Sequence, residues 1–265
     1  MPLLTRQMKI KIAHLSARTL VSTGAFYCGA YVALFGGEPA RGETVTNAVP
    51  MWDVSVAAGV TVTKGNSDTE LFTLTGRADK KWDANEIHLG LDAAYGEDQG
   101  EENNESVRAF GQYNLLFTER WYAYARAEGL HDAIADVEYR FTVGPGVGYY
   151  FIKNTNTTLS VDGGPAIVFE KEGPEERSYF TVRVGEKFEH KFNDRVRIWE
   201  AVEFLPQVDH FENYLINAEA GVESGLSKSW ALRFVLQDTY DNRPAPGRKE
   251  NDLKLVAALA WKLLH

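Results

Sequence analysis

The sequence is nearly free of cysteine, with Cys28 the only one among 265 residues. A single cysteine forms no internal disulfide, so a small secreted fold held together by disulfides is excluded. A lipoprotein signal has small residues just before its cysteine, whereas Phe26 and Tyr27 precede Cys28, so lipidation is not expected. The chain after this segment must therefore be stabilised by its secondary structure alone.

Long apolar runs and an excess of basic residues are also missing. After Gly42 no stretch approaches the roughly 20 apolar residues that a membrane-spanning helix needs. The chain has 28 Lys and Arg against 37 Asp and Glu, a formal net charge of −9. Because nucleic acids bind basic surfaces, this acidic balance argues against a nucleic-acid partner.

The first 42 residues have the pattern of a secretory signal peptide. Basic residues at 6, 9, 11 and 18 precede an apolar run over 20–35, and Ala40 and Gly42 suit cleavage after Gly42. A membrane anchor is the alternative, but the apolar run is short and interrupted by Ser22 and Thr23. Cleavage would remove five bases and one acid, which lowers the formal charge from −9 to −13. Residues 43–51 would form a short periplasmic lead.

The rest of the chain alternates between apolar and polar residues. Between Val137 and Tyr150 one face is wholly apolar, and the other carries Glu138, Arg140 and several glycines. Successive side chains on a strand point to opposite faces, so these segments predict strands with one apolar and one polar side. Twelve such segments lie within residues 52–63, 72–79, 87–95, 107–115, 121–128, 137–150, 159–169, 180–185, 196–204, 214–223, 230–237 and 252–262. We therefore predict an all-β fold, a transmembrane antiparallel β-barrel of about 12 strands over residues 52–265.

The connections between these segments favour the same fold. Those after even segments are short, and most of those after odd segments are longer and polar, as in barrels with periplasmic termini. Aromatic residues near strand ends fit the girdles where lipid meets water. A soluble β-sandwich also alternates, but its outer face would carry many more Lys and Glu residues.

The polar faces predict a charged lumen. Its proposed lining residues are Arg77, Asp92, Arg108, Arg126, Glu128, Glu138, Arg140, Asp162, Arg183, Arg197, Glu203, Glu219, Glu223, Arg233 and Lys254. Two hypotheses follow from this mixture of acids and bases. The charges form either a salt-bridged filling or the wall of a narrow, charge-selective channel for small solutes or ions.

Catalytic and cofactor motifs are absent from the sequence. No metal-ligand spacing, phosphate-binding glycine loop or nucleophile elbow is present, so we expect no enzyme and no cofactor. An outer-membrane lipid hydrolase is the remote alternative, because His88 and Asp92 fall on one inward face, where packing explains them better.

Acidic residues gather in the predicted external loops. They are Glu97, Asp98, Glu101, Glu102, Glu105, Glu170, Glu172, Glu175 and Glu176. We expect a solvated acidic rim, with divalent-cation bridging to lipopolysaccharide as the alternative.

Nearly all of the mature chain, about residues 52–263, resembles a known family. The strand opening at Trp52, the "GNSD" tip at 65–68 and "RIWEAVEFLP" at 197–206 are similar to the salt-induced outer membrane protein family. That family is an uncharacterised bacterial group expected to form β-barrels. The resemblance implies an outer-membrane location, contact with membrane lipids and lipopolysaccharide, and insertion by the barrel assembly machinery. It offers no site residues to carry over.

Some residues depart from an ideal barrel. The chain ends in His265 rather than an aromatic residue, and Glu186 and Glu200 fall on apolar faces, which predicts a rim position or a bulge. Pro145 and Pro165 cannot donate ladder hydrogen bonds, and their glycine neighbours predict bulges at similar heights on paired strands.

Overall fold

The computed structural model describes residues 52–64, 70–98 and 101–264, and these ranges form twelve strands. The strands are β1 (Trp52–Lys64), β2 (Glu70–Trp82), β3 (Asn85–Asp98), β4 (Glu101–Leu116), β5 (Trp121–Asp132), β6 (Val137–Lys153), β7 (Thr157–Glu172), β8 (Glu175–Lys191), β9 (Val196–Pro206), β10 (Tyr214–Gly225), β11 (Trp230–Asp241) and β12 (Asn251–Leu264). Within the described ranges, no helix is long and apolar enough to cross a membrane.

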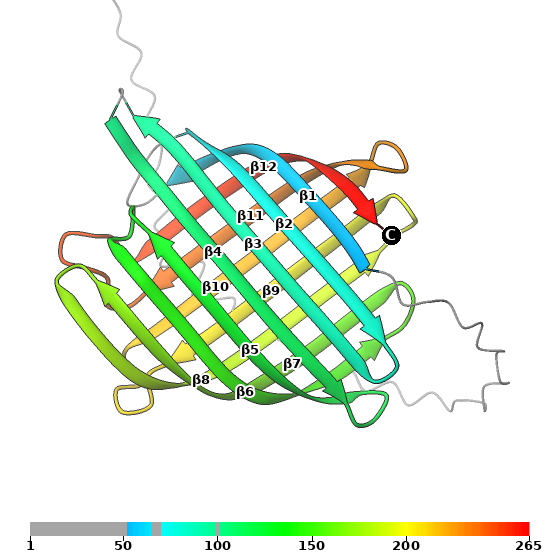
Figure 1. Ribbon diagram of the computed structural model, residues 1–265, viewed down its shortest axis with the longest axis horizontal. Coiled ribbons are helices and arrows are strands. Elements are labelled where there is room, and N and C mark those ends of the chain that lie inside the picture. Colours follow the sequence, from blue (N-terminus) through cyan, green and yellow to red (C-terminus); the bar gives the residue numbers. More distant parts are fainter. Residues whose placement is uncertain (1–51, 65–69, 99–100, 265) are drawn as a thin grey trace, which may run out of the picture. The chain divides into compact units, whose positions relative to one another are not determined.

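The twelve strands form one closed antiparallel barrel (Figure 1). Each strand pairs with its neighbours in sequence, and β1 closes the barrel against β12 from Val54↔Leu264 to Lys64↔Leu253. The start of β1 and the end of β12 lie at one end of the barrel. We call this end, which also holds the connections after even strands, the turn end, and the opposite end the loop end. The predicted twelve-stranded fold is confirmed.

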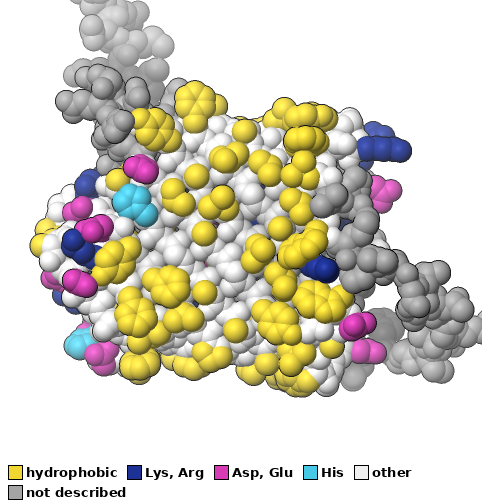
Figure 2. Space-filling model, viewed as in Figure 1, with side chains coloured by type: hydrophobic (Ala, Val, Ile, Leu, Met, Phe, Trp, Pro, Cys, Tyr) yellow, Lys and Arg dark blue, Asp and Glu magenta, His cyan; other side chains and the backbone are white. Residues whose placement is uncertain are grey.

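The outer wall is apolar. Side chains such as Phe72, 75% exposed, and Phe180, 66% exposed, point away from the barrel. Figure 2 shows apolar side chains spread over the wall, with charged groups near the two ends. An exposed apolar surface of this extent needs lipid around it, which makes the molecule a transmembrane barrel and excludes the soluble sandwich.

Aromatic rings gather near the strand ends, as in membrane barrels. Trp121 and Tyr149 lie 4.8 Å apart at the turn end, measured between ring centroids. Phe204 and Tyr214 lie 5.6 Å apart near the loop end. Rings at these two heights suit the two interfaces between lipid and water.

The two prolines lie side by side without a bulge, so that prediction was wrong. Pairing of β6 with β7 runs through Val143↔Ile167 and resumes at Val147↔Gly163 in the same register. Between these pairs the backbones approach closely, because an ideal Cβ on Gly144 would lie 2.3 Å from the carbonyl oxygen of Pro165. The glycines therefore serve a close approach of two backbones.

This close approach predicts that Gly144→Ala destabilises the barrel. The added methyl has no room against a backbone carbonyl, and such overpacking costs about 1–3 kcal/mol. We expect a lower urea midpoint in detergent, followed by the mobility shift of the folded barrel on unheated gels. Gly76→Ala is the matched control, since its Cβ would meet only Leu91 at 3.9 Å. Equal midpoints for the two variants would contradict this account.

Glu186 and Glu200 stay on the outer wall. The pairing of β8 with β9 is continuous, with Glu186 opposite Val202 and Phe188 opposite Glu200. No bulge turns either carboxylate into the lumen. Of the two expectations, a rim position or a bulge, the bulge was therefore wrong.

Two of the loop-end connections are shorter than predicted. The external loop predicted to carry Glu170, Glu172, Glu175 and Glu176 is mostly strand, because β7 continues to Glu172 and β8 begins at Glu175. Likewise β3 continues to Asp98 and β4 begins at Glu101. Among the described loop-end connections, 207–213 and 242–250 are the longest. The side chains of Glu97, Asp98, Glu101 and Glu102 lie outside the described residues.

Candidate functional site in the barrel lumen

Most of the predicted lumen residues interact with one another inside the barrel. Fourteen of the fifteen take part in interior ion pairs or hydrogen bonds. They are Arg77, Asp92, Arg108, Arg126, Glu128, Arg140, Asp162, Arg183, Arg197, Glu203, Glu219, Glu223, Arg233 and Lys254. The polar face of the alternation thus lies around the lumen.

Glu138 is the exception. The register of β6 against β7 shifts between Val137 and Tyr139, which breaks the alternation at this residue. The Glu138 side chain is 61% exposed and forms an ion pair with Lys171, beside Tyr139 in the register. A bulge, which single-strand periodicity does not reveal, therefore removes Glu138 from the interior set.

A cluster of charges crosses the middle of the lumen. Arg183 on β8 donates to Glu203 Oε1 from Nε at 3.0 Å and from Nη2 at 2.5 Å. Arg126 Nη2 on β5 lies 3.3 Å from the same oxygen, and Arg108 Nη2 on β4 lies 3.4 Å from Oε2. Neither β4 nor β5 neighbours β9, so these contacts span the interior. We call the six residues Arg108, Arg126, Glu128, Asp162, Arg183 and Glu203 the Glu203 cluster.

The remaining carboxylates of the Glu203 cluster hold its arginines. Glu128 accepts from Arg108 Nε at 2.9 Å and Nη2 at 3.0 Å, and from Arg126 Nη2 at 2.7 Å. Asp162 forms an ion pair with Arg183. Three guanidinium groups therefore face three carboxylates, and the cluster is neutral as a whole.

Tyrosines on β5 fill the lumen beside this cluster. Tyr122 and Tyr124 are almost fully buried and lie over Gly148 and Gly146 of β6. An ideal Cβ at either glycine would come within 2.4 Å of a tyrosine ring atom, so a larger residue there would displace the ring. Tyr122 also donates to Asp162 at 3.2 Å. The glycines on either side of Val147 thus make room for rings inside the wall.

A second cluster lies at the loop end, which we call the mouth cluster: Arg140, Glu170, Glu172, Arg177 and Asp241. Arg140 pairs with Glu170, donates to Glu172 at 2.9 Å and reaches Asp241 on β11 at 2.8 Å. Arg177 donates to Glu170 at 2.5 Å and to Glu172 at 3.2 Å. Since β6 and β11 are not neighbours, the cluster bridges the mouth.

Residues 242–250, which we call the strap, fold onto the mouth cluster. The backbone N–H of Ala245 donates to Glu172 Oε1 at 3.1 Å, and Ala245 is buried. Arg243 donates to Glu175 at 3.1 Å. A cross-lumen contact of 3.4 Å between Lys254 and Asp132 lies at the same end. The loop end of the lumen is therefore narrowed by side chains and by a connection.

Glu172 lies beyond the membrane-spanning part of β7. Its sequence neighbour Lys171 and Glu138 form an ion pair on the outer wall, which places this height outside the apolar belt. Burial raises the pKa of the Glu172 carboxyl to about 7, and nearby Asp241 and Glu170 act in the same direction against Arg140 and Arg177. Three carboxylates share two guanidinium groups here, so the docked mouth binds a proton near neutral pH.

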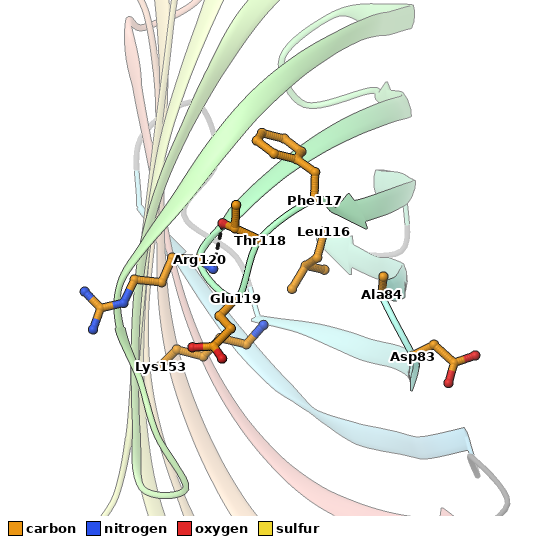
Figure 3. A pocket seen from close by; sticks show the side chains of 8 residues that line it. All are labelled: Asp83, Ala84, Leu116, Phe117, Thr118, Glu119, Arg120 and Lys153. Carbon is orange, nitrogen blue, oxygen red and sulfur yellow. Dashed lines mark hydrogen bonds between the residues drawn. The ribbon is translucent and has the colours of Figure 1, made fainter. Parts of the chain in front are cut away.

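A hollow of about 680 Å³ lies at the turn end (Figure 3). Its lining includes Asp83, Glu119 and Lys153, with Leu116 and Phe117 as apolar wall. Lys153 Nζ also lies 3.3 Å from Glu86 Oε1, which belongs to the charged interior. The hollow thus connects through Lys153 to the interior network.

His88 contacts carboxylates other than Asp92. His88 Nδ1 lies 2.5 Å from Asp79, directly opposite it in the register, and Nε2 lies 3.7 Å from Glu86. Asp92 instead pairs with Arg77 at 2.9 Å. These side-chain contacts of His88 are thus with two carboxylates, whereas a nucleophile–base pair joins a histidine to a hydroxyl or thiol.

The acidic residues predicted to form a solvated external rim are only partly exposed to solvent. Glu170 and Glu172 are buried and paired with arginines, which corrects the expectation of solvated carboxylates. In the described part of the chain, no group of three or more His, Cys, Asp or Glu side chains could hold a metal ion.

Several interior residues escaped the sequence prediction. They are Glu86, Tyr122, Tyr124, Glu170, Glu172 and Asp241. Alternation from the outward Trp121 would have placed Tyr122 and Tyr124 inside. Glu170 and Glu172 fall in a segment predicted as a loop, where periodicity assigns no face.

An apolar outer wall around a charged, ion-paired interior defines a transmembrane β-barrel of the outer-membrane type. The family model described as "Protein of unknown function, DUF481" matches residues 56–262. The chain belongs to this family.

Solved structures of porins and of a translocator domain are similar to this chain. The NanC porin aligns with a TM-score of 0.55 at 6% identity, over 78% of this chain and all of that one. The KdgM porin aligns at 0.47 and 8%, over 78% of this chain and 98% of that one. The translocator domain of autotransporter NalP from Neisseria meningitidis aligns at 0.48 and 11%, over 82% and 90%. No curated protein matches the sequence.

Proposed function

We propose that the protein is a narrow pore in the bacterial outer membrane for small ions or solutes. One observation carries the proposal: guanidinium groups in the middle of the lumen are not packed solid. The side chains of Arg77 and Arg108 keep 27% and 29% of their surface exposed, although both face inward. Room beside fixed charges is what a charge-selective path requires.

Two constrictions limit this path. The mouth cluster with the strap narrows the loop end, and the Glu203 cluster bridges the middle. Interior charges of both signs at each level favour ionic over apolar solutes. The conducting state is accordingly one of low conductance.

The expected surroundings follow from the proposed location. Export through the signal peptide would deliver the chain to the assembly machinery, and the apolar wall would then contact lipid and lipopolysaccharide. The resemblance to salt-induced proteins adds the proposal that the pore serves the envelope under salt stress.

The test is single-channel recording of the refolded mature chain in a planar bilayer, with ion selectivity measured in a salt gradient. We expect small, reproducible steps. A folded, heat-modifiable protein that stays electrically silent would overturn the pore.

A non-conducting structural barrel is the second candidate, favoured by the cross-lumen pairs Arg108–Glu203 and Arg140–Asp241. It predicts silence in the same recording. We propose no catalytic role, and the lipid hydrolase in particular would need a nucleophile beside His88, which is held by Asp79.

The conductance should rise with pH around neutrality. When the strap is docked on the mouth cluster, the Glu172 carboxyl holds its proton more tightly than a free carboxyl does. Docking of the strap is therefore favoured in acid and weakens as the pH rises through about 7. We expect larger single-channel steps at pH 8 than at pH 6, and a flattened dependence in Glu172→Gln. The charged or titratable groups around this carboxyl are Arg140, Glu170, Arg177 and Asp241. An unchanged pH dependence in the variant would contradict this assignment.

A further inference from the structure

Glu203 is the common partner of three guanidinium groups from three other strands. Arg183, Arg126 and Arg108 reach its two oxygens at distances of 2.5 to 3.4 Å. Guanidinium groups match the planar geometry of a carboxylate, and several around one carboxylate form a strong recognition site. Here the wall itself supplies the bound carboxylate, at the end of a side chain that crosses the lumen.

The arginines are held in place without Glu203. Arg108 and Arg126 are fixed by Glu128, and Arg126 also lies over the Phe110 ring with its Cζ 4.6 Å from the centroid. Arg183 pairs with Asp162 and donates to the Tyr124 hydroxyl at 3.3 Å. Removing the Glu203 charge therefore leaves a preorganised set of donors with one unbalanced positive charge.

We propose that this cluster is a binding site for the carboxylate group of a permeating anion, which replaces Glu203 on the arginines. The inference rests on the proposed pore and names its substrate class. In the resting protein Glu203 competes as a tethered ligand with a high effective concentration, so free carboxylates bind weakly. An anion advances by exchange with Glu203, and the arginines never face the lumen unpaired.

The test uses propionate, which has the chemistry of the glutamate side chain, and the variant Glu203→Gln in detergent. Calorimetry should show that this variant binds propionate roughly tenfold or more tightly than the wild type, because the tethered competitor is gone. Propionamide, which is neutral, should not bind. Equal propionate affinity in variant and wild type would overturn the site.

Glu219→Gln is the matched control. Glu219 is also an interior carboxylate, but it accepts from Trp199 Nε1 at 2.7 Å and from Gln237 at 2.8 Å, and neither donor belongs to the Glu203 cluster. Its loss should leave propionate affinity at the wild-type level. An equal gain in this control would show that any lost interior acid has the same effect, and would overturn the assignment to Glu203.

A second variant covers poor folding of Glu203→Gln. Glu203→Ala opens a space of propionate shape beside the arginines, so propionate should raise its urea midpoint, and propionamide should not. Absence of this rescue would also overturn the site. The two proposals fail in different ways. A barrel that binds propionate but does not conduct would contradict the pore alone. A barrel that conducts but does not bind propionate would contradict the binding site alone.

Discussion

Replacing Arg183 with glutamine is expected to lower the free energy of unfolding by about 3–5 kcal/mol, because it leaves buried carboxylates without their partner. Arg183 joins three strands through Asp162, Glu203 and the Tyr124 hydroxyl, and its side chain is 9% exposed. The measurement is urea unfolding in detergent, followed by tryptophan fluorescence and by the gel shift of the folded barrel.

Two comparisons sharpen this result. Arg195→Gln removes a guanidinium from the exposed turn before β9 and should change stability little. The double variant Arg183→Gln with Glu203→Gln should recover part of the loss, since one of the orphaned charges is then neutral. Additive losses in the double variant would show that the two side chains do not depend on each other.

Shortening the strap is expected to raise conductance roughly twofold or more, because it widens one of the two constrictions in series, the loop end, while the mouth cluster stays in place. The variant replaces residues 243–249 with a short Gly-Ser link and retains Asp241 of the mouth cluster. The contacts that the replacement removes include the hydrogen bonds from the Ala245 N–H to Glu172 and from the Arg243 guanidinium to Glu175. Single-channel recording at fixed pH measures the effect.

The connection 207–213 supplies the control for the strap. It lies at the same end but follows the wall, where Val208 N–H donates to the Phe180 carbonyl. Shortening it should leave conductance near the wild-type level. If both deletions raised conductance equally, the strap would have no special role, and if neither did, the mouth would not limit the current.

The period-two alternation predicted those features of the fold that a single strand determines. Twelve strands, an apolar outer face and an inward set including Arg108, Arg183 and Glu203 all follow from a period of two along the chain. The register between neighbouring strands determined features that alternation within one strand does not reveal. It turned Glu138 outward through a bulge, and it placed His88 opposite Asp79 rather than beside Asp92.

Long-range contacts in the lumen were beyond the sequence. The meeting of Arg108 with Glu203, or of Arg140 with Asp241, depends on which strands face each other across a closed cylinder. That depends on strand tilt and barrel size, which no local window contains. The strap shows the same limit, because a polar connection looks identical in sequence whether it extends into solvent or folds inward.

The pairing scheme also has a consequence for how the barrel assembles. Every pairing except one joins strands that follow each other in the chain, so each costs only a short loop closure. Hairpins can therefore be added one at a time as the chain becomes available. The seam between β1 and β12, where small residues such as Ala57, Gly59 and Ala258 lie close together, joins opposite ends of the barrel sequence. Its closure therefore brings together the two most distant strands of the barrel sequence, and of all the pairings the seam carries the largest loop-closure cost.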